Sequence, residues 1–345
     1  MNIRAKIVTW SDRVIYWAII FIPFVVSFSS AAVNVFIGFL AVGFLVKKIA
    51  LRDCSLAKTP VNIPFLFLLI IALISFINSI SIKASIQGIE KLLKYGLLFL
   101  IMASEIKDRK HVKWIIIAVI AGLFLSCSDG FYSLISGKDL FNADPPESIF
   151  GLLRIRAAFP STNILGGYLT LFLALPISLA LYYFKGRKKT LLLIVSAYVF
   201  YALIFTFSRS AIFGAWAAII FMAVVKKDKV ILFSSLFLII LLSVFSARIV
   251  TKLIGNQATV REIILEDERI NIYRASLNMI KHHPVIGVGV NTFSINFQKY
   301  KLQETKGFTG STQYYAHNIY LHMAGETGLI GLLVFIWLLF RVFKY

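Results

Sequence analysis

The chain has 345 residues, of which 59% are hydrophobic and 15% are charged, with a formal net charge of +20. Soluble domains carry about 25% charged residues, so this composition excludes an ordinary soluble protein and predicts a chain that lies mostly in lipid. A basic soluble protein would suggest nucleic-acid binding. Here the Lys and Arg residues lie in short clusters between apolar runs, which follows the positive-inside rule. We therefore expect a lipid bilayer as partner and no nucleic acid.

Apolar segments close to the length of a membrane span recur along the chain, since a spanning helix needs roughly 20 mainly apolar residues. Ten are predicted, at residues 14–30, 32–46, 62–80, 88–104, 114–135, 162–184, 190–207, 211–225, 230–246 and 317–340. The first follows Arg4, Lys6 and Arg13 but continues too far for a cleaved signal peptide, so we expect it to remain as a span. The predicted fold class is an all-α integral membrane protein with about 10 transmembrane helices.

The loops between these segments give the predicted orientation. More than half of the 36 basic residues lie in short loops on one side and at both termini. The other side has short connections and two longer polar loops, 136–161 and 247–316. The positive-inside rule therefore predicts cytoplasmic termini and two external loops. The predicted division is nine spans in 1–246, a large external loop in 247–316 and a last span in 317–345.

The external loop 247–316 is predicted to contain short amphipathic helices. One covers 267–282 and ends before Pro284. Its apolar stripe at helical spacing consists of Ile270, Tyr273, Leu277 and Ile280. A second short helix is predicted at 291–300, and residues 303–313 are rich in Gly, Thr and Ser, which predicts a mobile stretch.

A histidine stands where this polar loop meets the last apolar segment. His317 lies in the run Tyr315–Leu321, so its imidazole is predicted at the boundary between water and bilayer. Histidine is a common general base near neutral pH. In a helix, Ala324, Gly328 and Gly331 would stack below it as a groove of small residues. The same residues also allow close helix packing under a histidine that merely forms hydrogen bonds.

The remaining histidines and the cysteines predict neither a metal site nor a disulfide. His322 lies about 140° round the helix from His317, and the His-Glu-x-x-His spacing of metalloproteases is absent. No group of Cys, His and Asp residues has the spacing of metal ligands. Cys54 and Cys127 are predicted at opposite ends of membrane segments, so we expect no disulfide between them. We expect no metal and no cofactor.

Arginines near the predicted external boundary are the second group of candidates. Arg209 stands between two apolar runs, where a permanent charge is costly and usually paired or functional. Its guanidinium could clamp a phosphate, or it could reach the interface from a tight turn. Arg269 and Arg274 could present further cations, or form a solvated face beside an acidic run. Arg154 and Arg156 in the other external loop are a similar case.

The candidates all fall on the predicted external side, where no ATP or nucleotide-sugar is available. The sequence has neither a P-loop nor a Gly-rich dinucleotide turn, so the energy must arrive in the substrate, and a lipid-linked pyrophosphate sugar fits. A transporter or flippase would instead predict ionisable or broken segments near the midplane. Most spans have uninterrupted apolar centres. Glu90, Lys91 and Lys94 lie toward the outer half of their span and are predicted to be structural or to line a pocket.

Several stretches resemble the O-antigen ligase and polymerase family. The signature stretch is Tyr315–Leu321 followed by Gly325–Gly331, and the others are Thr206–Ala211, Glu268–Gly289 and Arg156–Gly166. The resemblance covers about 150–335. It implies an integral-membrane glycosyltransferase of the bacterial inner membrane, with its active site in the periplasm. The donor would be a polyprenyl-pyrophosphate-linked glycan, and transfer would be inverting and independent of metal.

The resemblance also implies roles for individual residues. His317 corresponds to the base that deprotonates the acceptor hydroxyl, and Arg209 and Arg269 correspond to the groups that hold the pyrophosphate. Further candidates for substrate binding are Arg156, Arg274 and Asn318. The acceptor is lipid A–core in a ligase, a lipid-linked glycan in a polymerase and a protein in related oligosaccharyltransferases, and the resemblance does not separate them. Family members usually carry further spans after the signature stretch, whereas this sequence ends at Tyr345, so we expect a short member or a truncated product.

Overall fold

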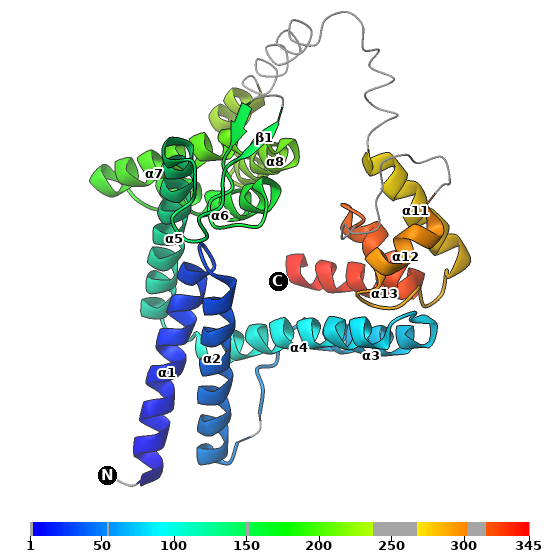
Figure 1. The fold of residues 1–345 in the computed structure, drawn as a ribbon. Helices are drawn as coiled ribbons and strands as arrows, with labels where there is room; N and C mark the ends of the chain where they lie inside the picture. Colours follow the sequence, from blue (N-terminus) through cyan, green and yellow to red (C-terminus); the bar gives the residue numbers. More distant parts are fainter. Residues whose placement is uncertain (1–2, 54, 150–151, 237–267, 302–314, 345) are drawn as a thin grey trace, which may run out of the picture. The chain divides into compact units, whose positions relative to one another are not determined.

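The computed structural model describes residues 3–53, 55–149, 152–236, 268–301 and 315–344, which are predominantly helical (Figure 1). The chain forms two compact units. The first unit consists of Met1–Cys54 and Glu105–Leu253, and the second unit consists of Ser55–Ser104 and Ile254–Tyr345. Each unit is thus built from two stretches that are far apart in the sequence.

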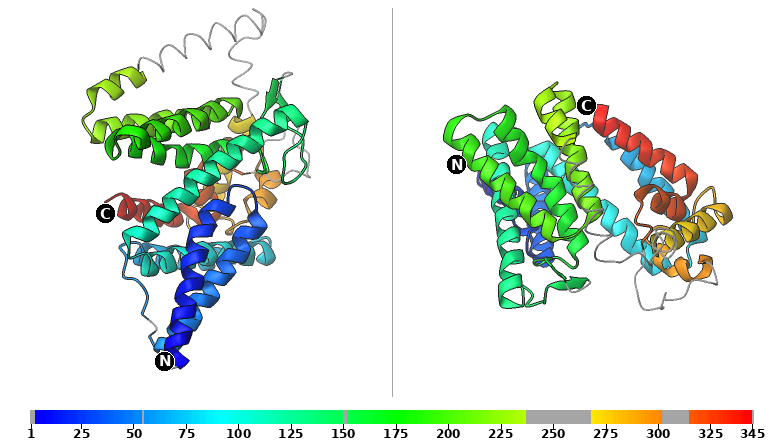
Figure 2. Two further views of the ribbon diagram at one scale, coloured as in Figure 1. Left: turned by 90° about the vertical axis from the view of Figure 1, so that its left-hand side faces the viewer. Right: turned by 90° about the horizontal axis from the view of Figure 1, so that it is seen from above.

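The first unit is a bundle of apolar helices. They are α1 (Ile3–Val25), α2 (Ser30–Leu51), α5 (Arg109–Ser136), α6 (Thr162–Tyr182), α7 (Gly186–Phe205) and α8 (Arg209–Val225). The helices α1 and α2 run side by side (Figure 1 and Figure 2). The core lies among α5, α6, α7 and α8, where Leu123, Leu169 and Leu203 are fully buried. Because lipid tails are as apolar as leucine, such contacts stabilise a bundle in the membrane by van der Waals packing.

A short hairpin separates α5 from α6. Strand β1 (Glu147–Ile149) pairs antiparallel with β2 (Leu152–Arg154), with Glu147 opposite Arg154. The sequence analysis predicted only a loop here, because strands are recognised from runs of about 4–8 residues and these have three. The N–H of Ile155 donates to the carbonyl of Phe205 at 3.1 Å, which ties the hairpin to the end of α7.

The second unit is built around the last helix of the chain. It contains α3 (Asn62–Ile74) with the 3-10 turn η1 (Ser75–Asn78), α4 (Ile82–Glu105), α11 (Glu268–His282), α12 (Phe293–Tyr300) and α13 (Ile319–Lys344). Phe293 and Phe297 of α12 are fully buried in a core shared with α11, Ala316 and Leu321. This core fixes the two short helices against the start of α13.

The predicted helical membrane fold is confirmed at the level of class. Six described helices, namely α1, α2, α5, α6, α7 and α13, are long and apolar enough to cross a membrane. The shorter apolar helices at Asn62–Asn78 and Arg209–Val225 coincide with two further predicted segments. Residues 229–236 are helical, but the rest of the predicted segment 230–246 lies outside the described residues, as does the stretch 303–313. The number of spans, the orientation and the three-part division stay predictions.

The two helices predicted in the loop 247–316 are present as α11 and α12, but the predicted apolar stripe of α11 is wrong. The buried side chains are Ile272, Ala275 and Met279, whereas Leu277 is 56% exposed. Two apolar stripes compete on this helix. The stripe with the small Ala275 is buried, which lets the large ring of Phe297 on α12 pack in the same core.

Candidate functional site

The second half of the signature stretch, Gly325–Gly331, breaks α13. Gly328 has φ 72° and ψ −178°, a combination open essentially to glycine alone, and a Cβ there would overlap the carbonyl of Val285. Three hydrogen bonds join the break to the loop after α11: Val288 N to Gly325 O at 2.9 Å, Gly289 N to Glu326 O at 3.0 Å and Leu329 N to Pro284 O at 2.8 Å. Two stretches of the family resemblance therefore form one backbone interlock, made of Pro284–Gly289 and Gly325–Leu329.

The predicted groove of Ala324, Gly328 and Gly331 below His317 is wrong. His317 precedes α13, and the helix is interrupted at Gly328, so these positions do not stack at helical spacing. The space at Gly328 is taken by the loop backbone, and a Cβ on Gly331 would overlap the side chain of Thr327. The space beside Gly328 and Gly331 is therefore filled by other atoms of the protein and is not open to a ligand.

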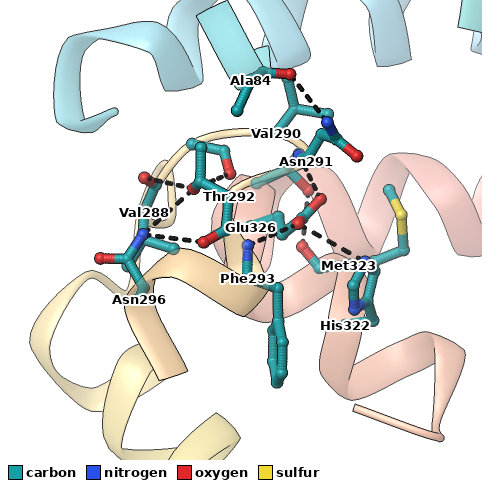
Figure 3. Close-up of polar contacts among 12 residues, drawn as sticks. Ala84, Val288, Val290, Asn291, Thr292, Phe293, Asn296, His322, Met323 and Glu326 are labelled. Atoms are coloured by element: carbon teal, nitrogen blue, oxygen red, sulfur yellow. Dashed lines mark hydrogen bonds and ion pairs between the residues drawn. The ribbon is translucent and has the colours of Figure 1, made fainter. Parts of the chain in front are cut away.

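At the break, α13 presents a buried carboxylate. Glu326 is 5% exposed, and its Oε2 accepts from the N–H of Asn291 at 2.7 Å while Oε1 accepts from the N–H of Phe293 at 2.9 Å. Figure 3 shows both bonds. These N–H groups stand at the start of α12, where a helix has donors without partners of its own and favours negative charge. Glu326 therefore caps α12 from a different helix.

The same carboxylate holds His322, four residues before it on α13. The Nε2 atom of His322 lies 3.5 Å from Oε1 of Glu326. The histidine ring packs against the ring of Phe293, with 5.0 Å between centroids, and lies 6.1 Å from that of Tyr315. The sequence analysis assigned His322 no role. The i, i+4 spacing of His322 and Glu326 was the signal that could have found the pair.

His317 lies exposed at the entry to α13. Its φ is 48°, in the left-handed region that residues other than glycine uncommonly adopt. The side-chain oxygen of Asn318 accepts from the N–H groups of Tyr320 at 2.9 Å and Leu321 at 3.2 Å. Asn318 thus caps α13 and fixes the backbone next to His317. Its predicted contact with substrate stays a prediction.

The interlock is held from another side by His283, just after α11. Its Nε2 lies 2.9 Å from the hydroxyl of Tyr300, and its Nδ1 lies 3.3 Å from Nδ2 of Asn78. Asn78 Nδ2 also donates to the carbonyl of Gly287 at 2.9 Å, so this nitrogen is a donor and Nδ1 is the acceptor of a neutral ring. Burial first, and then the nearby charge of Lys299, lower the pKa of His283. The lowered pKa agrees with the neutral form.

In the first unit, two of the candidate arginines, Arg154 and Arg209, lie at the turn between α7 and α8. Arg209 is the first residue of α8 and is exposed, next to N–H groups that favour an anion. Phe207 in the turn has φ 50°. The turn is supported by Arg154, whose Nε donates to the carbonyl of Thr206 at 2.9 Å. Within the described part of the chain, no ion pair of Arg209 is recorded.

Arg154 and Arg156 have acidic partners. Arg154 Nη1 lies 3.7 Å from Glu147, and Arg156 Nη2 lies 2.7 Å from Asp144. Glu147 also accepts from the hydroxyl of Thr162 at 3.1 Å, at the start of α6. These pairs give both arginines a structural role in the loop between α5 and α6. Substrate binding by Arg156 stays a prediction.

The other candidates lie in the second unit. Arg274 is exposed on α11. The backbone of Arg269 belongs to the first turn of α11, but its side chain lies outside the described residues. His317, Asn318 and the Glu326 cluster therefore lie in the first part of α13 or just before it, in the second unit, whereas Arg156 and Arg209 belong to the first unit.

A comparison with known families identifies a region that holds most of these residues. Residues 194–336 match the model of the O-antigen ligase family. A search of the curated proteins found no match to the chain.

The O-antigen ligase match confirms the resemblance drawn from the sequence. It contains Arg209, Arg269 and His317 and ends within α13. It begins later than the predicted start near 150, so Arg156 lies outside it. The six apolar helices indicate a membrane protein. Residues 194–336 are similar to the O-antigen ligase and polymerase family, whose members are membrane glycosyltransferase-like enzymes that act on lipid-linked glycans.

Proposed function

We propose that the protein is an O-antigen ligase-like glycosyltransferase that moves a glycan from polyprenyl pyrophosphate to lipid A–core at the periplasmic face of the bacterial inner membrane. The observation that carries this proposal is the O-antigen ligase match over residues 194–336. The matched range includes Arg209, Arg269 and His317.

In this proposal His317 acts on the acceptor. Its imidazole takes the proton of the acceptor hydroxyl while the hydroxyl oxygen attacks the anomeric carbon. The bond from that carbon to the pyrophosphate oxygen breaks on the opposite face, so the configuration inverts. Imidazole suits this role because it exchanges protons near neutral pH. The exposure of His317 and the cap by Asn318 support an accessible group with a defined position.

The arginines act on the leaving group. Pyrophosphate gains negative charge as its bond to the sugar breaks, so a guanidinium beside it stabilises the transition state more than the bound donor. Arg209 suits this role because it is exposed at the start of α8, where helix N–H groups also favour an anion. Arg269 supplies the second guanidinium in this proposal, and no metal or nucleotide takes part.

The test is reconstitution of the purified full chain with a polyprenyl-pyrophosphate glycan and lipid A–core, without metal or nucleotide. We expect transfer by the wild type and a loss of roughly 10²–10⁴-fold in His317→Ala, the usual contribution of a general base. His282→Ala is the matched control, because His282 is an exposed histidine on α11, and it should retain transfer. Undiminished transfer by His317→Ala would rule out the proposed mechanism.

The same assay separates the alternatives within the family match. Growth of the glycan on its lipid carrier without lipid A would identify a polymerase. Transfer to a protein acceptor would identify an oligosaccharyltransferase. Movement of intact lipid-linked glycan across the bilayer without any transfer would identify a flippase.

A further inference from the structure

An apolar groove lies between three helices of the second unit. Its volume is about 380 Å³. Its apolar lining includes Phe65 and Leu68 of α3, Leu92 and Phe99 of α4, and Phe335 and Leu338 of α13. Among the described residues that line the groove, none is acidic and Lys91 alone carries a charge. The lining therefore suits a hydrocarbon chain with one cation beside it.

Lys91 connects this groove to the candidate site. Its Nζ donates to Oδ1 of Asn291 at 3.2 Å, and the N–H of Asn291 donates to Glu326. The side chain of Lys91 is exposed. An ammonium has three N–H donors, and Asn291 takes one of them. An anion at the groove can therefore bind Lys91 without breaking its link to Asn291.

The position of Lys91 favours an anionic lipid over a neutral one. A charge within a membrane segment is costly and usually marks a partner or a substrate path. Lys94, one turn further along α4, is not part of the lining, so Lys91 is the cation at the groove. A lysine at an apolar groove complements a ligand that joins a hydrocarbon chain to a negatively charged phosphate group.

We propose that this groove binds part of the polyprenyl chain of the lipid-linked donor, with Lys91 beside the pyrophosphate. The identity of the occupant rests on the proposed function, because the donor is the lipid that carries both features. The groove positions the donor through its polyprenyl chain and not through its sugar. Lys91 supplies a cation at the groove and is linked through Asn291 to the carboxylate of Glu326.

The first arm of the test fills the groove. The full chain in nanodiscs is labelled with a polyprenyl pyrophosphate that carries a photoreactive group on its chain, and the labelled peptides are identified. Leu92→Trp, within the groove, should lower labelling of α3, α4 and α13 about tenfold, equal to about 1.4 kcal/mol of binding. Leu93→Trp is the matched control, since Leu93 is 50% exposed on the same helix and is not part of the lining. Equal melting temperatures of the two variants show that both are folded.

The second arm removes the charge. Lys91→Gln should lower labelling about tenfold, because it removes a charge-assisted hydrogen bond to the pyrophosphate. Lys91→Arg should restore it. Lys83→Gln, an exposed lysine on the same helix, should leave it unchanged. Unchanged labelling in both Leu92→Trp and Lys91→Gln would overturn the proposal.

The two proposals can fail separately. Photolabelling requires no glycosyl transfer, so an inactive protein that is still labelled in the groove contradicts the proposed function alone. If transfer continues but the label is found at residues outside the groove, the groove proposal alone is contradicted. Displacement of the label equally well by phosphatidylglycerol would identify the groove as a site for bulk phospholipid and would also overturn the proposal.

Discussion

Replacing Glu326 with glutamine tests whether its carboxylate holds the start of α12. Each oxygen of the carboxylate accepts one backbone N–H, from Asn291 at 2.7 Å and from Phe293 at 2.9 Å. A glutamine amide has one oxygen and one NH₂ group. Whichever way the amide is turned, its NH₂ faces one of the two N–H groups, so a buried donor loses its acceptor.

The expected cost follows from these contacts. A buried donor without an acceptor costs about 1–3 kcal/mol, and the lost negative charge at the start of α12 costs about 0.3–1 kcal/mol. We expect Glu326→Gln to lower the free energy of unfolding by about 1.3–4 kcal/mol. Glu326→Ala removes both acceptors and should cost more, about 3–5 kcal/mol.

The free energy of unfolding is measured by denaturation of the purified protein in mixed detergent micelles, followed by tryptophan fluorescence. Glu90→Gln is the matched control, because Glu90 is an exposed carboxylate on α4, and it should change stability by less than about 0.5 kcal/mol. If Glu326→Gln is as stable as the wild type, the carboxylate does not cap α12 and the reasoning is refuted.

Two further predictions concern the interlock. Gly328→Ala should lower the free energy of unfolding by about 3 kcal/mol, from backbone strain and displaced hydrogen bonds. Gly167→Ala in α6, where a Cβ meets open space, should change it by less than about 1 kcal/mol; equal stability of the two variants would contradict the interlock. Lowering the pH below 6.5 should destabilise the wild type, because the pKa of His283 is below its ordinary 6.5 in the folded chain, so the unfolded chain binds the proton first. His283→Gln should lose this part of the pH dependence and His282→Gln should keep it, as measured by melting temperature between pH 5 and 7.5; identical pH profiles for wild type and His283→Gln would be the contrary result.

The helices of the bundle could be predicted because apolar runs of spanning length have few other structures available in lipid. The break in α13 was not predicted. The apolar pattern continues through Gly328, and the partners that replace its helical hydrogen bonds come from Pro284–Gly289, far away in the sequence. Tertiary contacts therefore decide the backbone at this point, and local sequence does not.

The candidate site, like the fold, could be predicted only in part. The position of His317 before the last span followed from the boundary between polar and apolar sequence. The role of Glu326 did not, because its N–H donors at Asn291 and Phe293 are 35 and 33 residues away. Lys91 was placed as a structural or pocket-lining residue, and it lines the groove. Its bond to Asn291 spans 200 residues and required the fold.

The divided second unit has a consequence for synthesis in the cell. The α3–α4 hairpin is made early, whereas α11, α12 and α13 are made last, after the whole of Glu105–Leu253. Ser75 and Ser85 of the hairpin bond to the backbone of Val290. During translation these two hydroxyls lack their backbone partners until Val290 has been synthesised. The first unit can already fold before that point. A chain stopped before α11 would thus leave the hairpin without the partners that complete it.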